Sequence, residues 1–232
     1  MAEVFQTNLF NDSTLSAYYR LEGNSNDSKG SNNGSDTAIT YSTGNGKFGQ
    51  GAGFNGTTSK IAIADNAALD LDTGDFTITC WVNLVAKTST RHIISKLVDG
   101  SNFYELRASS AGDGIVMFDS YATVRKCQVI GTTSLSNGVW YFIAVVVDRD
   151  STANTKIYLN AVNDTAGTPT VSTDTIANAA ALWFGADQSG AGSNFYSGAV
   201  DDLAIFKGLA LSQAQITQLY IAQGGTNIAF EI

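Results

Sequence analysis

The chain has little histidine and little glutamate, and each scarcity argues against a class of site. His92 is the only histidine among 232 residues, so a zinc site is not credible. It is also the only possible histidine base for a nucleophilic triad, and no Gly-x-Ser-x-Gly segment accompanies it. Because His92 stands beside Ile93 and Ile94, we expect it at a strand edge rather than in catalysis.

Glutamate occurs four times, at Glu3, Glu22, Glu105 and Glu231, and none lies within two residues of another acid. Glycoside hydrolysis generally needs two carboxylates roughly 5–9.5 Å apart across the scissile bond. We expect Glu105, alone in its segment, to pair with a neighbouring base or water. The sequence therefore predicts that the protein is not an enzyme and has no catalytic residues.

Positive charge and long apolar runs are also scarce. Thirteen basic residues against 21 acidic ones give a net charge of −8, which argues against nucleic acid as a partner. No apolar run approaches the length of about 18 residues that a membrane helix needs. The first residues, 1–5, lack the basic and apolar regions of a signal peptide. Cys80 and Cys127 are the only cysteines, and the sequence leaves open whether they pair.

Short β-compatible runs separated by glycine-rich turns dominate what is present. The clearest strand is 76–84, which alternates between two faces, and 140–147 is apolar on both faces, as expected in the middle of a sheet. Further strands are expected at 16–22, 38–41, 60–64, 92–96, 103–107, 114–118, 126–130, 156–159, 181–184 and 200–206. Many short strands with almost no helix predict an all-β, two-sheet antiparallel sandwich.

One helix is expected near the C-terminus. Ser212 and Gln215 form a capping-box pattern, and Leu211 precedes it as a staple. The spacing of Ile216, Leu219 and Tyr220 gives the helix one apolar face, so it should dock on a sheet.

In this order, the segments resemble the laminin-G-like branch of the concanavalin A-like jelly roll. The ordered set carries the resemblance, and its parts are 21–23, 27–30, 46–56, 76–82, 93–96, 138–145, 156–160, 198–206 and 211–212. The chain departs from the family pattern at Asn160-Ala161 and at Tyr141-Phe142. The resemblance covers about residues 15–223, with 1–14 as an N-terminal arm and 224–232 as a tail.

The resemblance implies a binding module with one structural Ca²⁺ at the rim. Carried onto this sequence, it makes Asp201 the side-chain ligand, with backbone oxygens near Glu22 and in the turn that starts at Gly51, and Asp27 as a further candidate. Carboxylate and carbonyl oxygens are the ligands Ca²⁺ prefers. The alternative is that Asp201 and Asp202 simply alternate across the strand, one hydrogen-bonded and the other solvated.

The predicted function is non-catalytic, lectin-like carbohydrate binding. Aromatic residues near polar ones suggest a rim formed by loops 110–125 and 187–196, although each group could simply pack within its own loop. The candidate ligand-binding residues are Tyr121, Arg125, Asp187, Gln188, Asn194 and Tyr196.

Two alternatives to a lectin stay open. The first is a phage, virion or cell-surface structural module that makes protein–protein contacts or self-associates, and the second is an unusual glycoside hydrolase. An extracellular, cell-surface or virion-surface location is expected, with glycans as the main partner.

Overall fold

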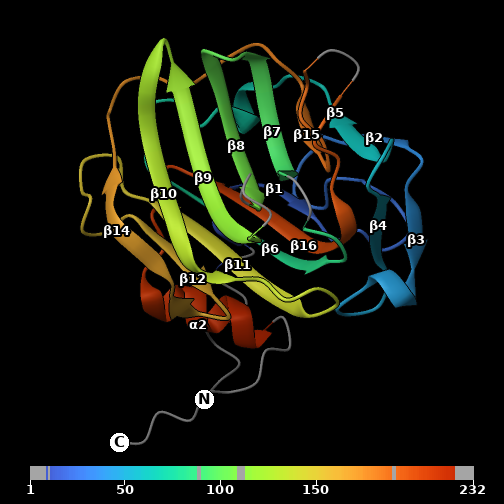
Figure 1. The fold of residues 1–232 in the computed structure, drawn as a ribbon. Coiled ribbons are helices and arrows are strands. Elements are labelled where there is room, and N and C mark those ends of the chain that lie inside the picture. Colours follow the sequence, from blue (N-terminus) through green and yellow to red (C-terminus); the bar gives the residue numbers. More distant parts are fainter. Residues whose placement is uncertain (1–8, 10, 88–89, 109–112, 190–191, 223–232) are drawn as a thin grey trace, which may run out of the picture.

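Two antiparallel sheets lie face to face (Figure 1) in this computed structural model, which describes residues 9, 11–87, 90–108, 113–189 and 192–222. The first sheet has the order β13 (Val162–Asn163), β12 (Lys156–Leu159), β11 (Trp140–Val147), β6 (Phe76–Leu84), β16 (Ser197–Lys207), β4 (Gly51–Asn55), β3 (Thr40–Ser42), with β1 (Leu15–Tyr19) paired to β16. The second has the order β14 (Thr165–Thr170), β10 (Val124–Ser134), β9 (Ile115–Ala122), β8 (Asn102–Ala108), β7 (Arg91–Asp99), β15 (Leu182–Phe184), β5 (Lys60–Ile63), β2 (Gly34–Thr37). The predicted jelly-roll sandwich is confirmed.

The main core fills the space between the sheets. On β6, one of the two alternating faces lies in this core, because Phe76, Ile78, Cys80 and Val82 are all fully buried there. Burial of such side chains contributes about 25 cal/mol per Å² of apolar surface removed from water. The alternation of β6 thus fixes which side of the first sheet faces the second sheet.

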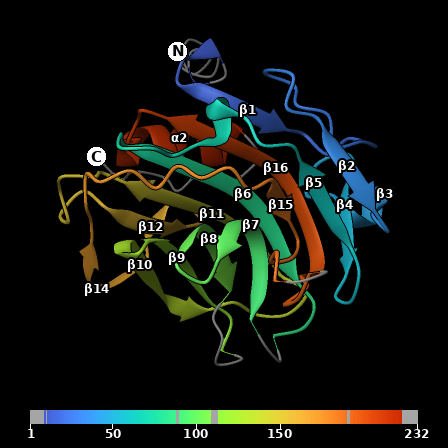
Figure 2. The ribbon, with the colours of Figure 1, turned by 90° about the horizontal axis from the view of Figure 1, so that it is seen from above.

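A smaller second core explains why β11 is apolar on both faces. Ile143, Val145 and Val147 join the main core, whereas Phe142 and Val146 point to the other side. On that side, α2 (Gln213–Ala222) packs against the first sheet, away from β7–β10 (Figure 2). The prediction that the 140–147 strand lies inside a sheet with both faces covered is confirmed by its neighbours β6 and β12.

The beginning of α2 is fixed as its sequence predicts. The Ser212 backbone N–H donates to Gln215 Oε1 at 2.9 Å, and the Gln215 N–H donates back to Ser212 Oγ at 3.4 Å. One side chain of β6 holds the preceding turn, since Thr77 Oγ1 donates to the Leu209 carbonyl and accepts from the Leu211 N–H. The helix is therefore tied to the sheet at its N-terminal end.

Several elements differ from the sequence expectation. β1 ends at Tyr19 rather than Glu22, because Leu21 adopts a left-handed φ of 58°. The segment expected at 38–41 forms part of β3, since Ala38, at φ 49°, separates it from β2. The strands β4 and β14 were not predicted, because neither GAGFN nor TAGTPT contains an apolar run.

Cys80 and Cys127 are free and buried, so no disulfide joins them. Burial raises the pKa of both thiols. The predicted tail at 224–232 and most of the predicted arm at 1–14 lie outside the described residues. No helix within the described ranges is long and apolar enough to cross a membrane.

Candidate functional site

The side of the second sheet that faces away from the core carries a group of polar and aromatic side chains. On β8 and β9, Tyr104, Leu106, Val116 and Phe118 belong to the main core, so the residues between them point outward. We call the following set the outer polar face: His92, Phe103, Glu105, Arg107, Asp119, Tyr121, Arg125 and Gln128. This set includes the predicted residues Tyr121 and Arg125, and its members come from the four adjacent strands β7, β8, β9 and β10.

Ion pairs connect these strands in sequence. Arg125 Nε lies 3.1 Å from Asp119 Oδ1, and Arg107 Nη2 lies 3.9 Å from Asp119 Oδ2. Arg107 Nε in turn lies 3.0 Å from Glu105 Oε1. The other Glu105 oxygen, Oε2, is 2.8 Å from His92 Nε2. One continuous set of polar contacts therefore runs from β10 to β7.

Asp119 is the most buried member of the outer polar face, with 2% of its surface exposed. Burial raises the pKa of its carboxyl, an effect that the nearby Arg125 and Arg107 oppose and that the negative Glu105 reinforces. Gln128 Nε2 also donates to Asp119 Oδ2, at 3.3 Å. The Arg125 side chain is 40% exposed, so Arg125 is the solvent-facing end of the network, whereas its partner Asp119 is buried.

Tyr121 provides an aromatic surface next to this network. Its ring stacks on Phe103, with centroids 5.0 Å apart and planes at 27°. The guanidinium carbon of Arg125 lies 5.1 Å from the Tyr121 centroid. Elsewhere on the sheet, Lys60 Nζ lies 3.7 Å over the Trp183 ring. Stacking leaves the Tyr121 ring and the guanidinium in fixed relative positions.

The predicted loop residues Asp187 and Asn194 adjoin the other end of the network. Asp187 accepts hydrogen bonds from the Ser189 N–H at 2.9 Å, the Ser193 N–H at 3.1 Å and Asn194 Nδ2 at 2.6 Å. Burial by itself would raise the pKa of Asp187, but these bonds and the neighbouring His92 outweigh it and lower the pKa. His92 Nδ1 lies 3.9 Å from Asp187 Oδ2. The structure thus connects the two predicted groups through His92.

The two remaining predicted residues serve the fold. Gln188 Oε1 accepts from the Leu97 N–H at 3.2 Å, and its Nε2 donates to the Ser95 carbonyl at 3.3 Å. Tyr196 is 1% exposed, and its ring packs edge-on against Phe54 in the main core. The expectation that Tyr196 contacts a ligand therefore conflicts with its position, because the side chain points inward.

Asp201, the predicted calcium ligand, lies on the opposite sheet and accepts backbone hydrogen bonds. Its Oδ2 receives the N–H groups of Lys47 at 2.8 Å and Phe48 at 3.1 Å, and its Oδ1 receives that of Asp202. Burial raises the pKa of Asp201 to about 7. Asp202 is not simply solvated, since Tyr18 Oη donates to its Oδ1 at 2.5 Å.

The other predicted ligands do not complete a metal site around Asp201. Glu22 Oε2 accepts the Gln50 N–H at 2.9 Å, and Asp27 accepts backbone N–H groups within the 18–32 segment, including Tyr18 at 3.0 Å. Gly51 begins β4 and is buried. In the part of the chain that the structure covers, no group of three or more His, Cys, Asp or Glu side chains could hold a metal. These side chains alone therefore form no metal cluster, and the predicted calcium site, which also uses backbone oxygens, stays a prediction.

Sequence reasoning missed the central pair of the network. Glu105 on β8 and Asp119 on β9 are directly opposite in the strand register, although 14 positions separate them. A search for neighbouring acids along one strand cannot find such a pair. The sequence does show that each acid lies on the outward side of its own alternating strand. This indicates a pair only when it is also known that the two strands are neighbours and which residues face each other.

Known proteins share this architecture. A family model described as the concanavalin A-like lectin/glucanases superfamily matches residues 55–217. The chain belongs to this superfamily. No curated protein sequence matches it. The superfamily assignment agrees with the two-sheet sandwich and with the resemblance noted from the sequence.

Solved structures share the fold. Domain 4 of AbnA, a GH43 extracellular arabinanase from Geobacillus stearothermophilus, solved in complex with arabinotriose, is 24% identical over 89% of this chain and 98% of its own, with a TM-score of 0.69. The binding domain of Paraclostridial Mosquitocidal Protein 1 is 15% identical over 92% of this chain and 52% of its own, with a TM-score of 0.71. A botulinum neurotoxin type C structure is 16% identical over 96% and 54%, with a TM-score of 0.67. The chain thus spans about half the length of these toxin chains.

Proposed function

We propose that the protein is a non-catalytic carbohydrate-binding module and that the outer polar face binds the sugar. The observation that carries the proposal is the Tyr121 ring, stacked on Phe103 and flanked by the Arg125 guanidinium. Phe103 and Tyr121 are both half-buried, so part of this aromatic surface stays exposed, and the C–H face of a sugar can pack on it. Donors and acceptors beside the ring would then bind the sugar hydroxyls.

The ion pairs give this surface a fixed geometry. Arg125 is held by Asp119 through Nε and Nη2, at 3.1 and 3.3 Å, so its orientation is set before a ligand arrives. Preorganised side chains lose less conformational entropy on binding than free ones. Gln128, held by the same carboxylate, adds a neutral amide to the surface.

The comparisons support this class of ligand. The arabinanase domain was solved with arabinotriose, and the type C neurotoxin work describes cell entry that depends on two ganglioside molecules. Another neighbour, the binding domain of botulinum neurotoxin DC, was solved with SialylT. These are properties of those proteins, and they make a glycan the first ligand to test here.

The network also argues for binding rather than hydrolysis. Glu105 and Asp119 are 7% and 2% exposed, and each is paired with arginine. A general acid or a nucleophile must reach the glycosidic bond, which these buried and paired carboxylates cannot do without breaking the network. We therefore expect no turnover of chromogenic glycosides.

A glycan array followed by calorimetry tests the proposal. Tyr121→Ala should weaken binding of any glycan that the array identifies by at least about tenfold, because it removes the stacking surface, and Arg125→Ala should also weaken it. Val124→Ala is the matched control, since Val124 is 58% exposed and adjacent to Arg125 in the chain. Unchanged affinity in both variants, or hydrolysis of a glycoside by the wild type, would contradict the proposal.

A further inference from the structure

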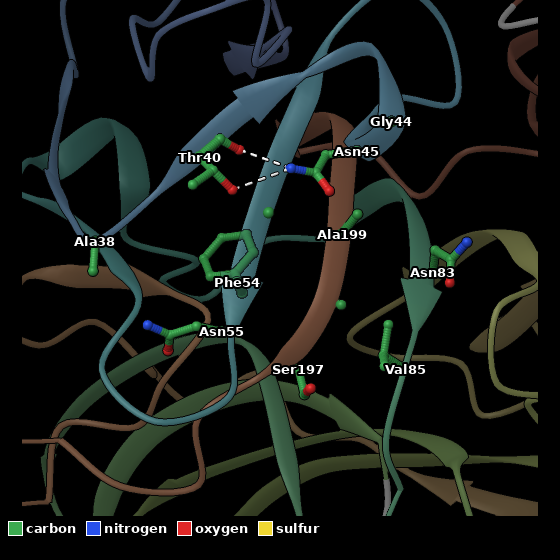
Figure 3. A pocket seen from close by; sticks show the side chains of 12 residues that line it. Ala38, Thr40, Gly44, Asn45, Phe54, Asn55, Asn83, Val85, Ser197 and Ala199 are labelled. Atoms are coloured by element: carbon green, nitrogen blue, oxygen red, sulfur yellow. Dashed lines mark hydrogen bonds between the residues drawn. The ribbon is translucent and has the colours of Figure 1, made fainter.

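A pocket of about 400 Å³ lies on the first sheet, whereas the outer polar face belongs to the second sheet. It is lined at the ends of β3, β4, β6 and β16, and Figure 3 shows Thr40 and Asn45 across the hollow from Asn83 and Ser197. Further along the sheet, outward residues such as Trp81, Phe142 and Phe206 pack with α2 in the smaller core. The pocket therefore lies beside the part of the outer surface that the helix covers.

Small residues create the hollow. Gly53 and Ala199 are register partners on β4 and β16, and both point outward between the walls. A Cβ atom at Gly53 would overlap Asn45 Nδ2 and lie 2.7 Å from Thr40 Oγ1. A side chain at this position would thus displace the Asn45 wall, so the pocket depends on the glycine.

The walls present neutral hydrogen-bonding groups. Asn45 Nδ2 donates to the Thr40 carbonyl at 3.0 Å and to Thr40 Oγ1 at 3.2 Å, which leaves Asn45 Oδ1 as an acceptor. The side chains of Asn83 and Ser197 make no hydrogen bond within the described part of the chain. None of the described residues that line the pocket is charged.

Asp201 holds the Asn45 wall in place. The N–H groups of Lys47 and Phe48, just beyond Asn45, donate to its carboxylate. The same two residues pack on Trp81, with Lys47 Nζ at 4.7 Å from the ring centroid and Phe48 edge-on at 5.6 Å. The loop is therefore anchored by a buried acid and an aromatic ring, and its amide is preorganised.

We propose that this pocket is a second binding site, for a small neutral ligand rich in hydroxyl groups, such as one uncharged sugar residue. Amide and hydroxyl side chains both donate and accept, which matches a hydroxyl group. A charged ligand would lose hydration and gain no opposite charge, so it is disfavoured. The volume falls at the lower end of the range of about 300–1,000 Å³ for small-molecule pockets. The pocket thus differs in chemistry from the charged outer polar face.

Nuclear magnetic resonance titration tests this site with glucose, galactose and arabinose, each at millimolar concentrations, and with glucuronate as the charged counterpart of glucose. We expect at least one neutral sugar to shift the side-chain amide signals of Asn45 and Asn83, and glucuronate to shift them much less. No shift with any of the three sugars, or equal binding of glucuronate, would overturn the proposal.

Variants separate this site from the outer polar face. Ala199→Leu fills the hollow and should abolish the shifts, and Asn83→Ala, at a half-buried position, should weaken binding by about tenfold. Val162→Ala, at an exposed position on the same sheet, is the control, and Tyr121→Ala should leave this binding intact. Unchanged binding in Asn83→Ala, or its loss in Tyr121→Ala, would assign the shifts to another surface.

Discussion

At the scale of single residues, Asp201 illustrates how a buried carboxylate can organise backbone. It is 1% exposed, and three N–H groups converge on its two oxygens. Two of these N–H groups belong to a loop about 150 positions away in the chain. The carboxylate therefore connects the last strand to the loop that precedes β4.

The raised pKa of Asp201 gives a pH dependence with a definite sign. The folded protein favours the protonated acid, with a pKa of about 7 against an ordinary value of 3.8, so Asp201 lowers stability as the pH rises through this interval. The Asp201→Asn variant should lack this component. We expect its free energy of unfolding, relative to the wild type, to increase between pH 4 and pH 7 by an amount on the order of a few kcal/mol, with its relative melting temperature rising in the same direction.

Thermal unfolding at several pH values measures this difference. Asp174→Asn is the control, because Asp174 is an exposed carboxylate whose pKa is lowered by its ion pair with Lys126. A constant offset between Asp201→Asn and the wild type across the whole interval would show that the carboxyl does not titrate there.

At the scale of elements, the helix α2 decides how much of the first sheet is closed. Trp81 on β6 stacks on Tyr220 of the helix, with centroids 5.6 Å apart and planes at 24°. Phe142 on β11 contacts both rings. The aromatic contact fixes the helix on β6 and β11 and leaves the β4 end of the sheet open.

The capping box makes α2 sensitive to one substitution. Ser212→Ala removes the acceptor of the Gln215 N–H and should lower the free energy of unfolding by about 1 kcal/mol. Denaturant unfolding measures the change. Ser28→Ala, at an exposed serine in a loop, is the matched control and should change stability much less. Equal effects in the two variants would mean that the cap does not stabilise the helix.

At the scale of the whole molecule, the sandwich is held by two apolar cores and by long-range hydrogen bonds. The second sheet carries ion pairs on its outer side, while the first carries the helix and the neutral pocket. The two outer surfaces thus differ in charge, which is why we propose different ligands for them.

Metal removal tests the calcium prediction on the whole protein. An ion that binds only the folded state raises stability, so its removal would lower the melting temperature. We therefore expect EDTA to lower the melting temperature of the wild type and to leave that of Asp201→Ala unchanged, because Asp201 is the predicted side-chain ligand. A wild-type melting temperature that EDTA leaves unchanged would contradict the calcium prediction.

The sequence by itself determined the fold class, because local alternation shows which side of each strand is apolar. The 76–84 strand, the doubly apolar 140–147 strand and the capped helix were all predicted, and two sheets plus one covering helix follow from them. Short or glycine-rich strands such as β4 were missed, since packing against neighbours rather than propensity forms them.

Only the tertiary structure decided the sites. The pairing of β8 with β9 places Glu105 opposite Asp119, and the path of β16 brings Asp201 to the N–H groups of Lys47 and Phe48. The pairing of β4 with β16 places Gly53 beside Ala199 and opens the pocket. Such neighbours depend on strand register between distant segments, which local periodicity does not specify.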